Sequence, residues 1–242
     1  MWSICKKDFN QFFSSLSGYI AIICFLLING IYLFVLPAYN ILDSGYATLD
    51  AFFTIAPWVM VILIPAITMR SFTDEYRSGT FETLRTRPIS PTKIVMGKYL
   101  AVLMIVALVL IPTFLYVITI RSLSINHQLD TGGLMGSYIG LMLLSAAYGA
   151  IGVFCSGFTS NPILSFLSAA FLCIIMYFGF SAISSIPTFK GGVDYYINLM
   201  GMDFHYRSIS RGVLDTRDFV YFILVGFFFL FITSKKIQQR AS

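Results

Sequence analysis

The sequence predicts an all-α integral membrane protein with six transmembrane helices. Hydrophobic residues make up 57% of its 242 residues, charged residues only 11%, and the mean hydropathy is +0.82, which lies outside the range of soluble domains. The apolar runs approach or exceed the roughly 20 residues that a helix needs to cross a hydrocarbon core. We expect one membrane domain over residues 1–242, with spans at about 19–38, 52–72, 97–120, 134–157, 163–186 and 218–234.

The N-terminal segment, residues 2–17, places aromatic side chains among charges at near-helical spacing. This pattern is typical of an interfacial helix lying in the headgroup layer, and a juxtamembrane tail is the alternative. Lys6 and Lys7 precede the first apolar run as they would in a signal peptide. That run is too long and lacks a small-x-small cleavage site, so we interpret it as an uncleaved first span.

The distribution of charge predicts the orientation in the membrane. With the N-terminus inside, the cytoplasmic segments hold eleven of the sixteen basic residues but only four of the eleven acidic ones. Because Lys and Arg accumulate on the cytoplasmic side, both termini are expected in the cytoplasm. The net charge of +5 therefore indicates orientation, and no nucleic-acid partner is expected.

Residues 70–98, between the second and third apolar runs, carry six basic and three acidic residues. Thr80–Arg85 is long enough for about one and a half helical turns, with Gly79 breaking the preceding segment and Pro88 ending it. Such a helix, parallel to the membrane, fits a cleft in a cytosolic partner. An ordinary positively charged loop is the alternative, and the residues alone do not separate the two.

Side chains within this loop are spaced to interact on one helix face. Asp74 and Arg77 are three residues apart, as are Glu82 and Arg85, and each pair is predicted to form an i,i+3 ion pair. Phe81 and Leu84, also three apart, form an apolar spot for a partner.

Several other features predict how the spans begin, bend and pack. Ser90 and Pro91 are suited to start the third helix, and Pro112 is expected to bend it. Small residues four apart in the fourth span, such as Gly136 and Gly140, allow close helix contacts, which we expect within the chain rather than at a dimer interface. Residues 183–217 are expected to form short helices associated with the outer leaflet.

The sequence lacks the reagents of several enzyme classes. No Gly-x-x-x-x-Gly-Lys-Ser/Thr motif is present, since the Gly97-Lys98 pair is followed by Tyr99, so the chain has no P-loop for ATP. The predicted spans hold no carboxylate pair or histidine for proteolysis or ion transport. His127 and His205 fall in outer loops and are expected to be solvated. No enzyme activity and no cofactor are expected in this chain, and its four cysteines are expected to be free thiols.

The loop pattern closely resembles a known family. Residues 72–98 read Phe72-x-x-Glu75-x-Arg77-x-Gly79-Thr80-x-Glu82-x-Leu84-x-Thr86-x-Pro88-x-Ser90, followed by Lys93 and Gly97-Lys98. This resembles the loop after span two in ABC-2 type exporter membrane subunits. Within that family the chain is most similar to the permease subunit of the bacterial gliding-motility transporter, and residues 210–222 add a shorter likeness to that group.

The resemblance implies a permease of the bacterial cytoplasmic (inner) membrane that pairs with a second membrane subunit or with itself. A separate cytosolic ABC ATPase would hold ATP and Mg, and the family's coupling glutamates match Glu75 and Glu82. The implied ATPase-coupling residues are Asp74, Glu75, Arg77, Gly79, Thr80, Phe81, Glu82, Leu84, Arg85 and Pro88. The competing hypothesis is a structural component that assembles motility or envelope machinery without transport.

Overall fold

The computed structural model describes residues 1–36, 41, 48–81, 90–123, 130–187, 191–212 and 215–241, and this part of the chain is helical throughout, without a strand. The helices are α1 (Trp2–Phe13), α2 (Leu16–Phe34), α3 (Asp50–Thr68), α4 (Thr73–Arg77), α6 (Pro91–Leu110), η1 (Ile111–Thr113), α7 (Phe114–Leu123), α8 (Thr131–Phe158), α9 (Pro162–Ile174), η2 (Ile175–Gly179), α10 (Phe180–Ser184), α11 (Val193–Leu199), α12 (Met202–Ser210) and α13 (Thr216–Ala241).

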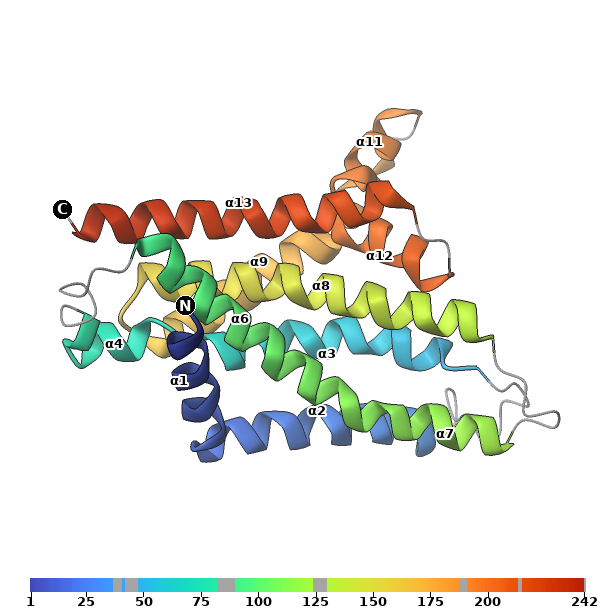
Figure 1. Cartoon of the computed structure of the whole chain (residues 1–242). Helices are drawn as coiled ribbons and strands as arrows, with labels where there is room; N and C mark the ends of the chain where they lie inside the picture. The colour runs from blue at the N-terminus through green and yellow to red at the C-terminus, as the bar shows by residue number, and fades with distance from the viewer. Residues whose placement is uncertain are drawn as a thin grey trace.

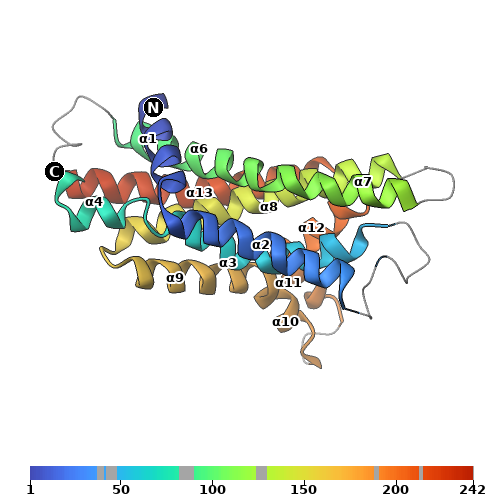
Figure 2. The same cartoon turned by 90° about the horizontal axis from the view of Figure 1, so that it is seen from below.

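The six predicted spans are confirmed. Among the described residues, six helical stretches are long and apolar enough to cross a membrane: Leu16–Phe34, Asp50–Arg77, Pro91–Leu123, Thr131–Phe158, Pro162–Ser184 and Thr216–Gln239. They run side by side as one elongated bundle (Figures 1 and 2). The fourth stretch is 72% buried whereas the first and fifth are each 22% buried, so α8 forms the centre of the bundle and α2 and α9 its margins.

Small residues let α8 approach its neighbours closely, as the sequence predicts. A Cβ added to Gly152 would lie 2.8 Å from Cβ of Thr68 in α3, and one on Gly149 would lie 3.1 Å from Val102 in α6. A Cβ on Gly140 would lie 3.0 Å from Ile209 in α12. These contacts confirm that the small residues pack within the chain.

Two predicted features of the third span are also confirmed. Ser90 is the N-cap of α6 and Pro91 its first residue, in agreement with the preference of proline for that position. Near Pro112 the α-helix gives way to the 3₁₀ turn η1 before α7 continues. Proline has no N–H to donate, which accounts for the interruption.

At one end of the bundle, α1 lies across the direction of the spans, as expected of an interfacial helix (Figure 1). It buries Ile4 and Cys5 while Lys6 and Lys7 stay exposed. Gly97 of α6 makes this contact possible, because a Cβ there would lie only 2.9 Å from the Met1 carbonyl oxygen and 3.1 Å from Cβ of Ile4. All four cysteines are free, as expected.

At the opposite end, the predicted short helices are α11 and α12 (Figure 1). Helix α12 folds back onto the spans, burying Met202, Tyr206 and Ile209. The Tyr206 hydroxyl donates a 2.7 Å hydrogen bond to the Phe53 carbonyl of α3. Just before this region the fifth span contains one π-helical turn, η2, which carries the buried Tyr177.

Candidate functional site

The charged loop begins with the short helix α4, directly after the second span. Its first residue, Thr73, donates a 2.6 Å hydrogen bond from its hydroxyl to the Met69 carbonyl. Helix α4 is followed by Gly79 at φ +70°, a left-handed conformation that glycine adopts without steric cost. The predicted break at Gly79 is therefore confirmed. Thr80 and Phe81 are again helical, and the predicted residues Glu82, Leu84, Arg85 and Pro88 lie outside the described residues.

The described members of the predicted coupling set divide into an outer and an inner group. Arg77, Gly79 and Thr80 are exposed and Asp74 is half-buried, whereas Glu75 and Phe81 are buried. The expected Asp74–Arg77 ion pair is not among those found in the described part of the chain. Asp74 instead accepts a 3.4 Å hydrogen bond from Gln11, because α1 lies beside α4.

Phe81 packs inward in this structure. Its ring meets Tyr76 edge-on with centroids 4.9 Å apart, and Tyr76 stacks on Phe72 at 6.1 Å. The Tyr76 hydroxyl donates to the Gly157 carbonyl at the end of α8. This row of rings fixes the loop to the bundle, so Phe81 supports the loop from within rather than forming a freely exposed apolar spot.

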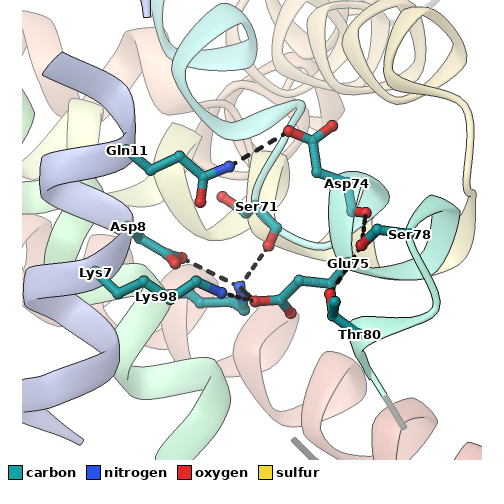
Figure 3. A network of polar contacts seen from close by, with 9 residues as sticks. All are labelled: Lys7, Asp8, Gln11, Ser71, Asp74, Glu75, Ser78, Thr80 and Lys98. Carbon is teal, nitrogen blue, oxygen red and sulfur yellow. Dashed lines mark hydrogen bonds and ion pairs between the residues drawn. The ribbon is translucent and has the colours of Figure 1, made fainter. Parts of the chain in front are cut away.

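Lys98 lies at the centre of the site (Figure 3). Although it is a lysine in α6, its side chain is fully buried. Its ammonium lies 3.0 Å from Oε1 of Glu75 and 3.1 Å from Oδ2 of Asp8, and it donates to the carbonyl of Ser71. It also lies 4.7 Å from the centre of the Phe72 ring. A buried ammonium is tolerated only with such partners, since its desolvation is costly.

Helix α1 supplies the other two charges of the cluster. Lys7 donates a 2.7 Å hydrogen bond to the same Oε1 of Glu75, and Asp8 contacts Lys98 from the opposite side. Burial raises the pKa of the Asp8 carboxyl, an effect that the charge of Lys98 opposes. Burial acts to lower the pKa of Lys7, but the hydrogen bond and charge of Glu75 outweigh it and raise that pKa. Two cations and two anions thus balance within one cluster.

The Lys98 cluster, defined as Lys7, Asp8, Glu75 and Lys98, joins three segments far apart in the sequence. A cavity of about 70 Å³ adjoins it, lined in part by Asp8, Glu75 and Lys98. A space of this size admits one or two water molecules. Any displacement of α4 must therefore move α1 and α6 or break a buried ion pair, while the adjoining cavity leaves room for rearrangement.

Sequence reasoning selected Glu75 but missed its partners. Lys7, Asp8 and Lys98 lie 68, 67 and 23 residues from it along the chain, and only the fold brings them together. The Gly97-Lys98 pair was the feature of the sequence that could have indicated the cluster. Its glycine allows a close helix contact, and its lysine directly precedes a long apolar run.

A buried histidine–aspartate contact lies at the other end of the bundle and corrects the expectation for His205. Its Nδ1 lies 2.6 Å from Oδ1 of Asp218 and its Nε2 lies 2.9 Å from the Leu199 carbonyl oxygen. The ring is buried and stacks on Tyr221 at 3.9 Å, so the prediction of a solvated side chain is wrong. The reason is that α12 folds back onto α13. His127 lies outside the described residues.

Comparison with known protein families assigns most of this chain to one family. A family model described as ABC-2 family transporter protein matches residues 14–176, which run from the end of α1 into the fifth span. The match covers more than half of the chain, and the chain belongs to the ABC-2 family of transporter proteins. It is thus a multi-pass membrane component of a transporter. No curated protein matches the chain.

Proposed function

We propose that this chain is the permease subunit of an ABC transporter whose ATP hydrolysis takes place in a separate cytosolic ATPase. The observation that carries the proposal is the position of α4. It presents exposed residues on one side and, on the other, a carboxylate bound to a buried lysine of the third span. Such an element can receive a force at the surface and transmit it into the membrane domain.

The proposed docking surface consists of Asp74, Arg77, Gly79 and Thr80, continued by Glu82, Leu84, Arg85 and Pro88. This docking surface is supported by the exposure of Arg77, Gly79 and Thr80, which lie next to the half-buried Asp74. The polar rim of a protein interface is formed by residues of this kind. Glu75 and Phe81 then have internal roles: Glu75 links α4 to Lys98, and Phe81 anchors the loop to Tyr76.

Transmission would follow the contacts of the Lys98 cluster. When the ATPase subunits close, α4 moves with them, and Glu75 pulls on Lys98 of α6 and on Lys7 of α1. The second span moves too, since α4 follows it after a single turn. Spans two and three would thereby change their relative position, with α1 following along the membrane surface.

A second membrane subunit, either another copy of this chain or a related one, would cover the margin formed by α2 and α9. These spans flank α3, which exposes Trp58 and Ile62. A cysteine at Ile62 should cross-link two membrane subunits, whereas one at Phe228 of α13 should not. Cross-linking at Phe228 alone would place the interface on α13.

Export from the bacterial cytoplasm is proposed on the sequence resemblance to exporter subunits. An amphipathic or apolar cargo is proposed over a small ion, because the spans are predominantly apolar. A role in gliding motility rests on the sequence resemblance alone. Deletion of the gene should then abolish surface spreading, and restoring the chain should restore it. Normal spreading of the deletion strain would remove the motility role while leaving the permease assignment intact.

Photocrosslinking tests the docking surface directly. A photoreactive amino acid at Thr80 should capture a soluble ABC ATPase in intact cells, and one at Tyr195 of α11, at the opposite end of the bundle, should not. Absence of a Thr80 adduct, with normal amounts of the chain, would argue against the docking surface. Cargo-stimulated ATP hydrolysis by the reconstituted complex then separates a transporter from a purely structural assembly.

A further inference from the structure

A groove of about 400 Å³ lies between α6, α8 and α13, and no residue of the Lys98 cluster lines it. Its walls are almost entirely hydrocarbon, including Val95 and Met96 of α6, Leu143 of α8, and Phe227 and Leu230 of α13. All of these residues belong to candidate membrane spans, so the surrounding medium is the lipid bilayer. An apolar groove in this setting accepts a hydrocarbon chain.

The groove passes over Gly226 of α13. A Cβ added there would meet the Tyr99 hydroxyl oxygen at 3.8 Å, an ordinary van der Waals distance, which leaves space above the helix. The Tyr99 hydroxyl itself donates to the Ala146 carbonyl, so this polar atom of the wall already has a partner. The lining of α13 runs from Phe222 to Ser234, which is about 18 Å at 1.5 Å per residue. That is slightly more than half of the roughly 30 Å hydrocarbon core, or about one leaflet.

One end of the groove is polar and basic. Thr92 and Ser234 line it there, and each is followed by an exposed lysine, Lys93 and Lys235. The ammonium of Lys235 lies 5.6 Å from the ring centre of Phe231, another lining residue, which places a positive charge at the mouth of the groove. Lysine side chains in this position reach along the apolar surface to the headgroup layer.

We propose that this groove binds one anionic phospholipid from the leaflet on the Lys235 side. One acyl chain lies along α13 over Gly226, and the headgroup phosphate is held by Lys235 near the hydroxyls of Ser234 and Thr92. The combination of a leaflet-long apolar groove with an ammonium at one end selects this ligand over a neutral lipid. The site is separate from the proposed docking surface and does not depend on what the transporter carries.

Native mass spectrometry of the purified full-length chain tests the proposal, using dioleoyl phosphatidylglycerol and dioleoyl phosphatidylcholine as probes. The anionic lipid should bind about fivefold more tightly, as expected for one lysine beside a headgroup of net negative charge, because the choline ammonium of the other lipid offsets the charge of its phosphate. Lys235→Gln should reduce the preference to less than about twofold. Lys236→Gln is the matched control, since its ammonium lies over Phe158, which is outside the groove, and the preference should persist.

Filling the groove provides a second measurement. Gly226→Leu should abolish retention of both lipids, whereas Gly226→Ala, whose methyl group has space, should retain them. Equal binding of the two lipids by the unmodified chain would overturn the proposal, and so would equal losses in the Lys235 and Lys236 variants. If Gly226→Leu leaves lipid retention unchanged but dissociates a dimer, the groove is an interface with a second copy and the lipid proposal is wrong.

Discussion

Oε1 of Glu75 accepts a 2.7 Å hydrogen bond from Lys7 and forms an ion pair with the Lys98 ammonium at 3.0 Å. One carboxylate oxygen thus connects the loop after the second span to the N-terminal helix and to the third span. The two lysines differ greatly in environment, because the Lys98 side chain is fully buried and that of Lys7 is 52% exposed. This difference makes the contributions of the two contacts separable.

Lys98→Met should destabilise the folded chain far more than Lys7→Met. Removing Lys98 leaves Glu75 and Asp8 without their buried counter-charge, which typically costs about 3–5 kcal/mol. Removing the solvent-exposed Lys7 should cost about 0–1 kcal/mol. Thermal unfolding in detergent measures both. Equal melting temperatures for the two variants would contradict the predicted difference, and a Lys98→Met variant as stable as the native chain would show that the cluster does not stabilise the fold.

Asp8→Asn should cost less stability than Glu75→Gln. Burial already disfavours the ionised form of Asp8, and Glu75 contacts two ammonium groups where Asp8 contacts one.

Because the pKa of Asp8 is raised in the folded chain, its protonation favours folding. That contribution is present below its unfolded pKa and is lost as pH rises through the folded pKa. The native chain should therefore lose stability relative to Asp8→Asn as the pH rises from acidic values toward neutrality. A pH-independent difference would contradict this.

Gly97→Ala should loosen α1 from α6. The added methyl group would meet the Met1 carbonyl and Ile4, and such overpacking costs about 1–3 kcal/mol. Gly30→Ala in α2 is the matched control, because a Cβ there would meet only the Tyr116 hydroxyl oxygen, at 3.8 Å. Hydrogen exchange should accelerate in residues 2–13 of the Gly97 variant alone. Unchanged exchange there would mean that α1 does not depend on the Gly97 contact.

Arg77→Glu and Phe81→Ala should have different effects. Reversal of the exposed Arg77 should weaken ATPase association, by about 2–5 kcal/mol if the charge is partly desolvated in the complex, without changing the melting temperature of the chain. Phe81→Ala should lower the melting temperature, because it removes a buried ring packed on Tyr76. Glu82→Lys is expected to weaken association like Arg77→Glu. Co-purification of the ATPase and thermal unfolding, measured on the same preparations, distinguish the two effects.

The orientation can be checked by labelling in intact cells. In a background without cysteines, one cysteine at Tyr195 should react with an impermeant thiol reagent applied from outside, and one at Ser78 should not. The two residues are exposed and lie in helices or turns at opposite ends of the bundle. Labelling of Ser78 from outside would reverse the topology and place the proposed docking surface on the wrong side of the membrane.

The spans could be predicted from the sequence because hydropathy and length depend only on neighbouring residues. The same holds for the bend near Pro112 and the break at Gly79, where one residue's backbone decides the outcome. Burial of Lys98 and His205 could not be predicted, because each depends on partners supplied by other helices. Glu75 could be singled out as a member of the charged loop, but whether it faces a partner or the interior depends on how α1 crosses α6.

The π-helical turn in the fifth span has a consequence for how this chain tolerates changes of length. Residues 175–179 accommodate one residue more than a regular helix would need, and deleting one of them would allow the helix to continue without the bulge. Side chains beyond such a deletion would keep their direction around the helix axis, because the regular helix makes the same turn with one residue fewer. A deletion elsewhere in the fifth span would instead rotate them by about 100°, since an α-helix has 3.6 residues per turn, and Ser184 would lose the 2.9 Å hydrogen bond that connects it to Asn198 of α11. Loss of a single codon is therefore absorbed within residues 175–179, whereas the same loss a few residues earlier would turn the whole outer end of the helix toward different neighbours.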